Sequence, residues 1–572
     1  MKSPRTVFLK TPFEEYLYEN SIPFSEYPRP QFKRDSYICL NGKWSLSIKN
    51  QTLEKWRGDI IVPFPPESRI SSVCRTIKSD DTLIYTREFA IPNDFIQNKV
   101  FLHFGACDQY TTVSINGNTV GKNVGGYLPF SFDITEFVRV GVNNITVEAT
   151  DPLDKDIPYG KQTFARGGMW YTNISGIWQT VWIESVPKDN IKTIKITPSL
   201  DGVHIGVDGG TNDKTLILKS ENNDIFYNFS GNEFDLKIES PVYWTPENPH
   251  LYYFTLISGD DKIESYFALR TIDIADVGGK QYIRLNGKPY FFHGLLDQGY
   301  FSDGIYTPAT PEGFKNDILQ MKSCGFNTLR KHIKLEPDLF YYYCDKYGMV
   351  VFQDMINNGK YNFFIDTALP TVTIKSGIRH KADNHRKEEF YRTAYGIADL
   401  LYNHPSVCYY TIFNEGWGQF DADGCYSNLK AYDKTRIWDA TSGWFRGKYS
   451  DVDSEHIYFK PVKLKSKHRP LVLSEFGGYS CKIKEHSFNH DKTFGYPFFK
   501  NTDDFENALI SMYEKEIIPC IKNGLCAAVL TQVSDVEDET NGLLTYDRKV
   551  LKVNAERMSQ LADRLKKAFY EQ

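Results

Sequence analysis

The chain has 572 residues, which exceeds what a single hydrophobic core supports and predicts about three domains. Hydrophobic residues make up 41% and charged residues 24%, as in ordinary globular proteins. The net charge of −5 provides neither a basic surface for nucleic acid nor a polybasic patch for anionic lipid, so neither partner is predicted.

The N-terminal segment and the cysteines point to the cell interior and to a protein without metal sites. Residues 1–20 lack the continuous apolar core of a signal peptide, and no apolar run reaches the roughly 20 residues that span a bilayer. The 10 cysteines show no Cys-x-x-Cys pairs and no regular spacing, which argues against a disulfide framework and a zinc site. We therefore predict a cytoplasmic protein that requires no metal and no cofactor.

Residues 1–186 carry a β pattern throughout. Several short runs are rich in β-branched and aromatic residues and are bounded by turn residues: Tyr85–Ile91, Val100–Phe104, Thr112–Ile115 and Asn144–Ala149. Asn116-Gly117 separates two apolar segments, which is typical of a hairpin with a type I′ turn. Because no helical periodicity competes, we predict a jelly-roll β-sandwich.

Residues 187–275 continue as shorter and more polar strands. Turn residues interrupt them at Asp208-Gly209-Gly210 and Ser230-Gly231-Asn232, and Pro187-Lys188-Asp189 is predicted to be the linker from the first domain. About 85 residues of short strands suit a small immunoglobulin-like β-sandwich.

From residue 276 to residue 572 the pattern changes to alternating strands and helices. Eight runs are predicted as strands: Tyr290–Gly294, Asn327–Arg330, Met349–Gln353, Val407–Phe413, Arg436–Ala440, His456–Tyr458, Leu471–Ser474 and Ala527–Thr531. Gly325 and Gly348 are predicted to end the first two helices. Eight strands in about 290 residues match a (β/α)8 barrel, and no glycine-rich phosphate loop supports a doubly wound sheet. The predicted fold class is therefore multidomain, with two β-sandwiches followed by a C-terminal (β/α)8 barrel.

Two glutamates stand where barrel enzymes carry their catalytic groups, at the C-terminal ends of strands. Glu415 follows an apolar run and Asn414, and Gly416 comes directly after it. Glu475 also follows an apolar run, and two glycines come soon after it. Two carboxyl groups in one site are what glycoside hydrolysis requires, because one protonates the leaving oxygen while the other attacks or positions water at the anomeric carbon.

The order of motifs resembles glycoside hydrolase family 2, the family of β-galactosidases, β-glucuronidases and β-mannosidases. Asn414-Glu415 is similar to the acid/base motif of that family, and Ser474-Glu475-Phe476-Gly477 to its nucleophile motif. Segments from all three predicted domains also resemble the family: Gly125–Phe130, Gly176–Trp182, Trp244–Tyr252 and Asn286–Pro289. The resemblance covers essentially the whole chain.

The resemblance implies a role for each of five residues. Glu415 would be the acid/base and Glu475 the nucleophile of a double displacement that retains the anomeric configuration. Asn414 would hydrogen-bond the 2-hydroxyl of the sugar. Arg330 would orient the nucleophile carboxylate, and Tyr458 would hydrogen-bond it, although a structural ion pair and a packed core tyrosine are the alternatives for these two.

The residues expected to recognise the sugar depart from the family pattern. Asp297 and Gln298 stand where the family often has a histidine, and they are candidate ligands of sugar hydroxyls or caps of a loop. His332 and Asp354 are further candidates at strand ends, with a satisfied histidine at the barrel rim and a strand-end charge bonded to a loop as the alternatives. Trp417 and Trp444 are either stacking platforms or core residues. After the last strand, Thr540–Leu544 lacks the Asn-x-Lys pair with which the family's glucuronidases bind the sugar carboxylate, which argues against a glucuronide substrate.

The sequence thus predicts a retaining exo-β-glycosidase that acts on a β-linked glycoside or oligosaccharide, with β-galactosidase as the first choice. β-Mannosidase, β-glucosidase and β-glucuronidase stay open, and a non-catalytic carbohydrate-binding protein is the alternative from another class. A serine hydrolase is disfavoured because no Gly-x-Ser-x-Gly motif is present. The resemblance also implies a homodimer or homotetramer.

Overall fold

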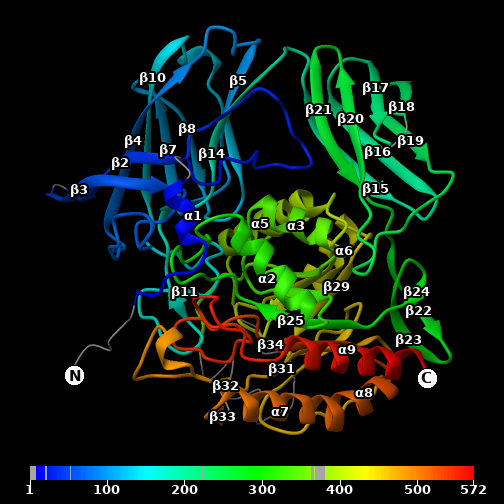
Figure 1. Ribbon diagram of the computed structural model, residues 1–572. Helices are drawn as coiled ribbons and strands as arrows, with labels where there is room; N and C mark the ends of the chain where they lie inside the picture. The colour runs from blue at the N-terminus through cyan, green and yellow to red at the C-terminus, as the bar shows by residue number, and fades with distance from the viewer. Residues whose placement is uncertain are drawn as a thin grey trace.

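The computed structural model describes residues 8–19, 22–51, 53–220, 223–362, 366, 381–495 and 497–571. Two β-sandwiches lie side by side on top of an α/β barrel in the view of Figure 1. This arrangement confirms the predicted fold class. The limits of the three domains at residues 186 and 275 stay predictions.

The N-terminal sandwich consists of a six-stranded and a four-stranded antiparallel sheet. The six-stranded sheet has the order β3-β2-β4-β10-β7-β8, with β3 Leu53–Val62, β2 Gly42–Asn50, β4 Asp81–Ile91, β10 Gly141–Thr150, β7 Tyr110–Ile115 and β8 Asn118–Val124. The other has the order β1-β14-β5-β9, with β1 Tyr37–Cys39, β14 Val181–Val186, β5 Lys99–Phe104 and β9 Phe130–Asp133. Alternate residues of β7 are buried, as one apolar face requires. Asn116 and Gly117 both have positive φ, 51° and 84°, which confirms the type I′ turn between β7 and β8.

The second sandwich is smaller. A three-stranded sheet contains β15 Ile191–Pro198, β16 Gly202–Gly209 and β19 Glu233–Lys237. A four-stranded sheet contains β18 Ile225–Ser230, β17 Asp213–Leu218, β20 Tyr252–Ser258 and β21 Asp261–Phe267. A separate apolar core fills the space between them. A short sheet of β22 Ile272–Val277, β23 Lys280–Leu285 and β24 Lys288–Pro289 then leads into the barrel.

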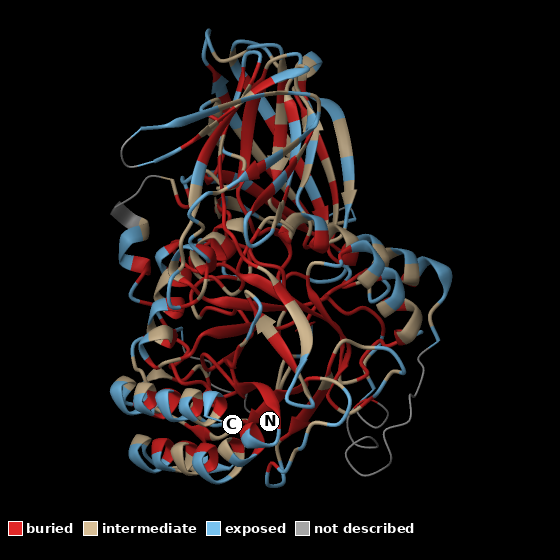
Figure 2. Ribbon diagram, turned by 90° about the vertical axis from the view of Figure 1, so that its right-hand side faces the viewer, coloured by how far each residue is buried: buried red, intermediate tan, exposed pale blue. Residues whose placement is uncertain are grey.

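The barrel has eight parallel strands in sequence order. They are β25 Phe292–Asp297, β26 Thr328–Lys331, β27 Val350–Asp354, β28 Val407–Asn414, β29 Ile437–Ser442, β30 Asp453–Ile457, β31 Leu471–Gly477 and β34 Leu525–Thr531. Seven ladders join them, and β29 lies against β30 to bring the ring together. Nearly every residue of these strands is buried (Figure 2), because side chains fill the barrel on the inside and helices cover it on the outside.

Helices surround the barrel strands: α2 Glu312–Ser323, α3 Asp338–Tyr347, α5 Asn384–Leu401, α6 Ala422–Tyr432, α7 Thr502–Met512, α8 Ile518–Lys522 and α9 Ala555–Tyr570. Helix α3 ends at Gly348 with φ 73°, and α2 is followed by Gly325 with φ 84°. Both predicted helix stops are thereby confirmed. Within the described residues, no helix is both long and apolar enough to cross a bilayer.

Candidate active site

Glu415 and Glu475 project from the C-terminal ends of two barrel strands. Glu415 comes directly after β28 and has φ 53°, a left-handed conformation that few non-glycine residues adopt. Its N–H donates to the carbonyl of Ser442 at 2.9 Å, which holds this turn in place. Glu475 lies near the end of β31, before Gly477 with φ 86°. Backbone conformations of this kind often accompany functional sites.

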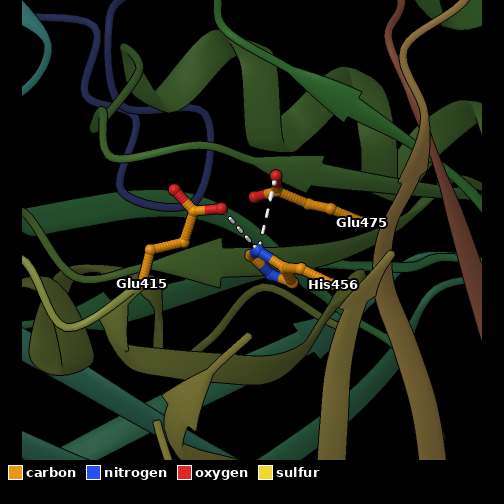
Figure 3. Close-up of side chains that lie close together, drawn as sticks. All are labelled: Glu415, His456 and Glu475. Carbon is orange, nitrogen blue, oxygen red and sulfur yellow. Dashed lines mark hydrogen bonds and ion pairs between the residues drawn. The ribbon is translucent and has the colours of Figure 1, made fainter. Parts of the chain in front are cut away.

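The two carboxyl groups meet at the imidazole of His456, which faces both of them (Figure 3). One carboxylate oxygen from each glutamate and one ring nitrogen of His456 all lie within 4.8 Å of one another. Within the described part of the chain, no other set of three His, Cys, Asp or Glu side chains brings its polar atoms this close. The expectation that no metal is required stays a prediction.

Glu475 is almost completely buried and is held as a carboxylate. Arg330 Nη1 donates to its Oε1 at 3.0 Å, and the Tyr458 hydroxyl donates to its Oε2. Burial opposes ionisation, but His456, Arg330 and His332, with the Tyr458 hydrogen bond, lower the pKa of Glu475 to about 2. An ionised, oriented carboxylate at neutral pH is what a nucleophile requires.

Arg330 joins four barrel strands through its guanidinium group. Besides Glu475, it donates to Asp354 Oδ1 at 2.9 Å, to Asn414 Oδ1 at 2.8 Å and to the Ser474 carbonyl at 3.0 Å. Its side chain is only 1% exposed. Asp354 in turn contacts His332 Nδ1 at 2.7 Å, so this aspartate binds two basic side chains.

The cavity above the glutamates has a volume of about 670 Å³, within the range of pockets that bind small ligands. Four of the predicted site residues besides the glutamates line it: Gln298, His332, Trp444 and Tyr458. Arg330, Asn414 and Asp354 are not among the lining residues and lie directly behind it, bonded to one another.

Asp297 and Trp417 are also placed away from the cavity wall. The carboxylate of Asp297 accepts from Lys331 Nζ at 2.7 Å and from the Gly299 N–H at 2.9 Å, so this aspartate fixes the loop after β25. Trp417 donates from Nε1 to the Gly359 carbonyl and packs edge-on against Trp170. In these places Asp297 caps a loop and Trp417 packs in the core, the alternatives that the sequence left open.

Several residues in or directly beside the cavity were not predicted from the sequence. His456 could have been found, because it lies near the C-terminal end of β30 and two residues before Tyr458. Lys161 and Gly167–Trp170 had no such signal, since they belong to loops of the N-terminal sandwich. Others follow barrel strands without any motif: Phe459, Phe494, Glu539 and Asn541.

Lys161 and Glu539 set the charge at one side of the cavity. Burial raises the pKa of Glu539 to about 7, although Lys161 and hydrogen bonds from Tyr171 and Gln532 lower it. Lys161 is 8% exposed and, with the described residues, forms no ion pair within 4 Å and no side-chain hydrogen bond. Because Lys161 lines the cavity, its ammonium group is placed to bind a ligand that supplies acceptors.

Comparisons with known proteins agree with this geometry. Residues 67–187 match the family model described as glycosyl hydrolases family 2, sugar binding domain, and residues 277–562 match the model described as glycosyl hydrolases family 2, TIM barrel domain. Among solved structures, the β-glucuronidase of an uncultured Clostridium sp. is similar with a TM-score of 0.73 at 18% identity, covering 94% of this chain and 99% of that one. This likeness supports the fold.

Two relatives show the range of names among similar sequences. The chain is 24% identical over 467 residues to a putative β-glucuronidase of Formosa agariphila, covering 71% of this chain and 51% of that protein. It is 27% identical over 297 residues to a β-galactosidase of Thermoanaerobacter pseudethanolicus, covering 47% of this chain and 39% of that protein. The alignments thus span about half, or less, of these relatives' lengths.

Proposed function

Because the chain belongs to glycoside hydrolase family 2, we propose that it removes a terminal β-linked sugar with retention of configuration, with Glu475 as nucleophile and Glu415 as acid/base. The observation that carries this proposal is the separation of the two carboxyl groups, whose nearest oxygens lie within 4.8 Å. Retaining enzymes place these groups about 5–5.5 Å apart, whereas inverting enzymes leave roughly 6.5–9.5 Å for a water molecule.

In the first step, the Glu475 carboxylate attacks the anomeric carbon while Glu415 gives its proton to the glycosidic oxygen, which leaves with the aglycone. In the second step, Glu415 takes a proton from water, and that water displaces Glu475 from the sugar. Asn414 supports both steps. Because its Oδ1 accepts from Arg330, its NH₂ group is the part left to donate to the 2-hydroxyl of the sugar.

The polar groups opposite the glutamates are proposed to bind the sugar ring. Gln298 is 6% exposed, and its side-chain oxygen has no hydrogen-bond partner among the described residues. His332 uses Nδ1 for Asp354, which leaves Nε2 for a ligand. Asn541 accepts from Gln532 through Oδ1 and likewise keeps its NH₂ group. Neutral donors and acceptors of this kind suit hydroxyl groups, so a β-galactoside stays the first candidate.

Lys161 supports a second candidate substrate, a β-uronide such as a glucuronide or galacturonide. The sequence argued against an acidic sugar because Thr540–Leu544, after the last strand, lacks the Asn-x-Lys pair. Lys161 provides the missing cation from the N-terminal sandwich, and below pH 7 a protonated Glu539 leaves that cation uncompensated. A sugar carboxylate would then be paired instead of buried alone.

Aromatic side chains at the mouth of the cavity are proposed to bind the aglycone. Phe459 lines the cavity although it is 70% exposed, so it lies at the rim. Trp444, Tyr361 and Phe494 line the same cavity. Flat rings pack on the apolar faces of sugars and on aromatic aglycones, which would bury their surface beside Glu415.

A panel of 4-nitrophenyl β-glycosides tests the proposal. We expect hydrolysis of at least one neutral or acidic β-glycoside, with the β-anomer of the free sugar appearing first in the NMR spectrum. Initial release of the α-anomer would overturn the retaining mechanism, and binding without turnover would indicate a carbohydrate-binding protein. A Lys161→Met variant should lose activity on uronides by roughly 10-fold or more, because it removes a charge-assisted bond, and should keep activity on galactosides if they are also substrates.

We also propose that the protein forms a homodimer or homotetramer, which light scattering tests, and that it is cytoplasmic, which fractionation of the native cells tests.

A further inference from the structure

His456 lies between the two glutamates and contacts both of their carboxyl groups. Its Nδ1 lies 2.9 Å from Glu415 Oε1 and 3.6 Å from Glu475 Oε2, and its side chain is fully buried. Charged groups face it from three strands or strand ends: Glu415, Glu475 and Arg330. Trp444 covers the ring from the side, with 6.2 Å between ring centroids.

The hydrogen bonds on the far side of the ring indicate which nitrogen carries hydrogen. Ser474 Oγ donates to the carbonyl of Glu455, so the single hydrogen of Ser442 is the one that bridges the two serines. Ser442 Oγ therefore accepts from His456 Nε2, which lies 3.0 Å away.

Arg330 does not change this assignment. Its Nη1 lies 3.3 Å from His456 Nε2, but both hydrogens of Nη1 are taken at 3.0 Å, one by Ser474 O and the other by Glu475 Oε1. A neutral His456 with hydrogen on Nε2 presents a lone pair at Nδ1. The 2.9 Å contact with Glu415 then needs a proton between the two atoms.

We propose, on the basis of the proposed function, that His456 is a positioning residue that shares the proton of Glu415 and aims its carboxyl group at the glycosidic oxygen. In the resting enzyme the proton lies between Glu415 Oε1 and His456 Nδ1. When the glycosidic bond breaks, the proton passes to the leaving oxygen, and the water that attacks the glycosyl–Glu475 ester returns one proton to the pair.

Sharing a proton in this way solves an electrostatic problem of the site. Two carboxylates this close in a buried cavity repel each other, which costs free energy in a low dielectric. A bridging proton keeps the Glu415–His456 pair neutral wherever the proton lies along the bridge. Glu475 then stays paired with Arg330 and faces no second negative charge from Glu415.

The test compares His456→Gln with the parent protein on substrates of different leaving group. The glutamine reaches the Nε2 position and keeps a partner for Ser442, but it leaves Glu415 without one. We expect kcat/KM to fall roughly 10- to 100-fold for an alkyl glycoside, which depends on the acid, and less than about threefold for a dinitrophenyl glycoside. The high-pH limb of the profile for the alkyl glycoside should move to lower pH.

His293→Gln is the matched control. His293 is a buried barrel histidine whose Nε2 contacts the Tyr513 hydroxyl at 3.2 Å, away from the cavity. The His293→Gln variant should lower the stability of the fold, whereas the leaving-group dependence and the pH profile of kcat/KM should stay as in the parent protein. Equal losses of His456→Gln on both substrates, with an unmoved high-pH limb, would overturn the proposal.

Nitrogen NMR provides a readout that does not depend on turnover. In protein labelled with ¹⁵N-histidine, the His456 signal, assigned by its loss in His456→Gln, should show hydrogen on Nε2 and an Nδ1 shift between the values of a bare and a protonated nitrogen. A bare Nε2 with full protonation of Nδ1 at every pH would refute proton sharing. If the parent protein hydrolyses no β-glycoside, the proposed function fails, and the NMR result still decides the state of His456.

Discussion

Replacing Arg330 with glutamine should change the acid side of the pH profile. The pKa of Glu475 is lowered from 4.5 to about 2, which corresponds to roughly 3 kcal/mol in favour of its ionised form. Arg330 is the permanent cation among the groups responsible, and it lies 3.0 Å from the carboxylate. In the parent protein, kcat/KM should therefore stay constant as the pH falls below the ordinary pKa range of glutamate, until the protein unfolds.

In Arg330→Gln, burial is no longer opposed by that cation, so the pKa of Glu475 should rise. The Glu475 carboxylate is active when ionised, so the acid limb should move upward, towards the ordinary glutamate range, although His456 continues to lower this pKa. At pH 7 the variant should also lose activity. Removing one partner of a buried ion pair costs about 3–5 kcal/mol, or roughly 10²- to 10⁴-fold if the loss falls on the transition state.

The assay is kcat/KM for a dinitrophenyl glycoside from pH 3 to 8, because that leaving group does not depend on Glu415. Arg270→Gln is the matched control. Arg270 is 2% exposed, and its guanidinium donates to the carbonyls of Pro405, His404 and Val407 at the other end of the barrel. It should lower stability without moving the acid limb. An unmoved acid limb in Arg330→Gln would refute the electrostatic account of Glu475.

Three further predictions concern the glutamates, the sugar pocket and metal ions. Glu475→Ala should abolish turnover of every substrate, whereas Glu415→Ala should still cleave a dinitrophenyl glycoside. Added azide should speed turnover by Glu415→Ala by about 10-fold or more and give a β-glycosyl azide. Formation of an α-azide by Glu475→Ala instead would show that the roles are reversed. If both sugar classes are substrates, the ratio of kcat/KM for a uronide to that for the matching galactoside should fall as pH rises through about 7. Above that pH Glu539 is ionised, so it compensates the charge of Lys161 and repels a sugar carboxylate. A ratio that is constant from pH 5 to 8 would contradict this. Prolonged dialysis against EDTA should leave activity within about 20% of its starting value, since Arg330 already provides the cation of the site, and recovery of lost activity by added magnesium would disprove it.

The barrel and its two glutamates could be predicted because local signals and general rules agree there. All eight predicted strands are present, and the structure shifts their ends by a few residues. Glu415 and Glu475 were found because apolar strands followed by glycine turns place side chains at one end of a barrel. The sequence alone provided no distance between them, since that depends on how eight strands close.

The sugar pocket could be predicted only in part, for two physical reasons. First, part of its wall comes from loops of another domain, and no local pattern connects Lys161 or Trp170 to strands hundreds of residues away. Second, the sequence left open whether Asp297 binds the sugar or caps a loop. In the structure Asp297 pairs with the buried Lys331, which also contacts Glu336 at 2.8 Å. The charged groups of such a pair satisfy each other inside the protein, and no sequence pattern indicates that they are paired.

The wall contributed by the N-terminal sandwich has a consequence for how substrate preference can change. Tyr171 donates to Glu539 at 2.9 Å although the two residues are 368 positions apart, and the Thr172 N–H donates to Glu537 at 3.0 Å. These bonds attach the segment after Lys161 to the last barrel loop. Under the proposed function, one stretch of the gene encodes bond cleavage and another encodes part of the sugar preference. Exchange of the N-terminal sandwich between homologues would therefore alter which sugar is accepted while leaving the cleavage chemistry in place.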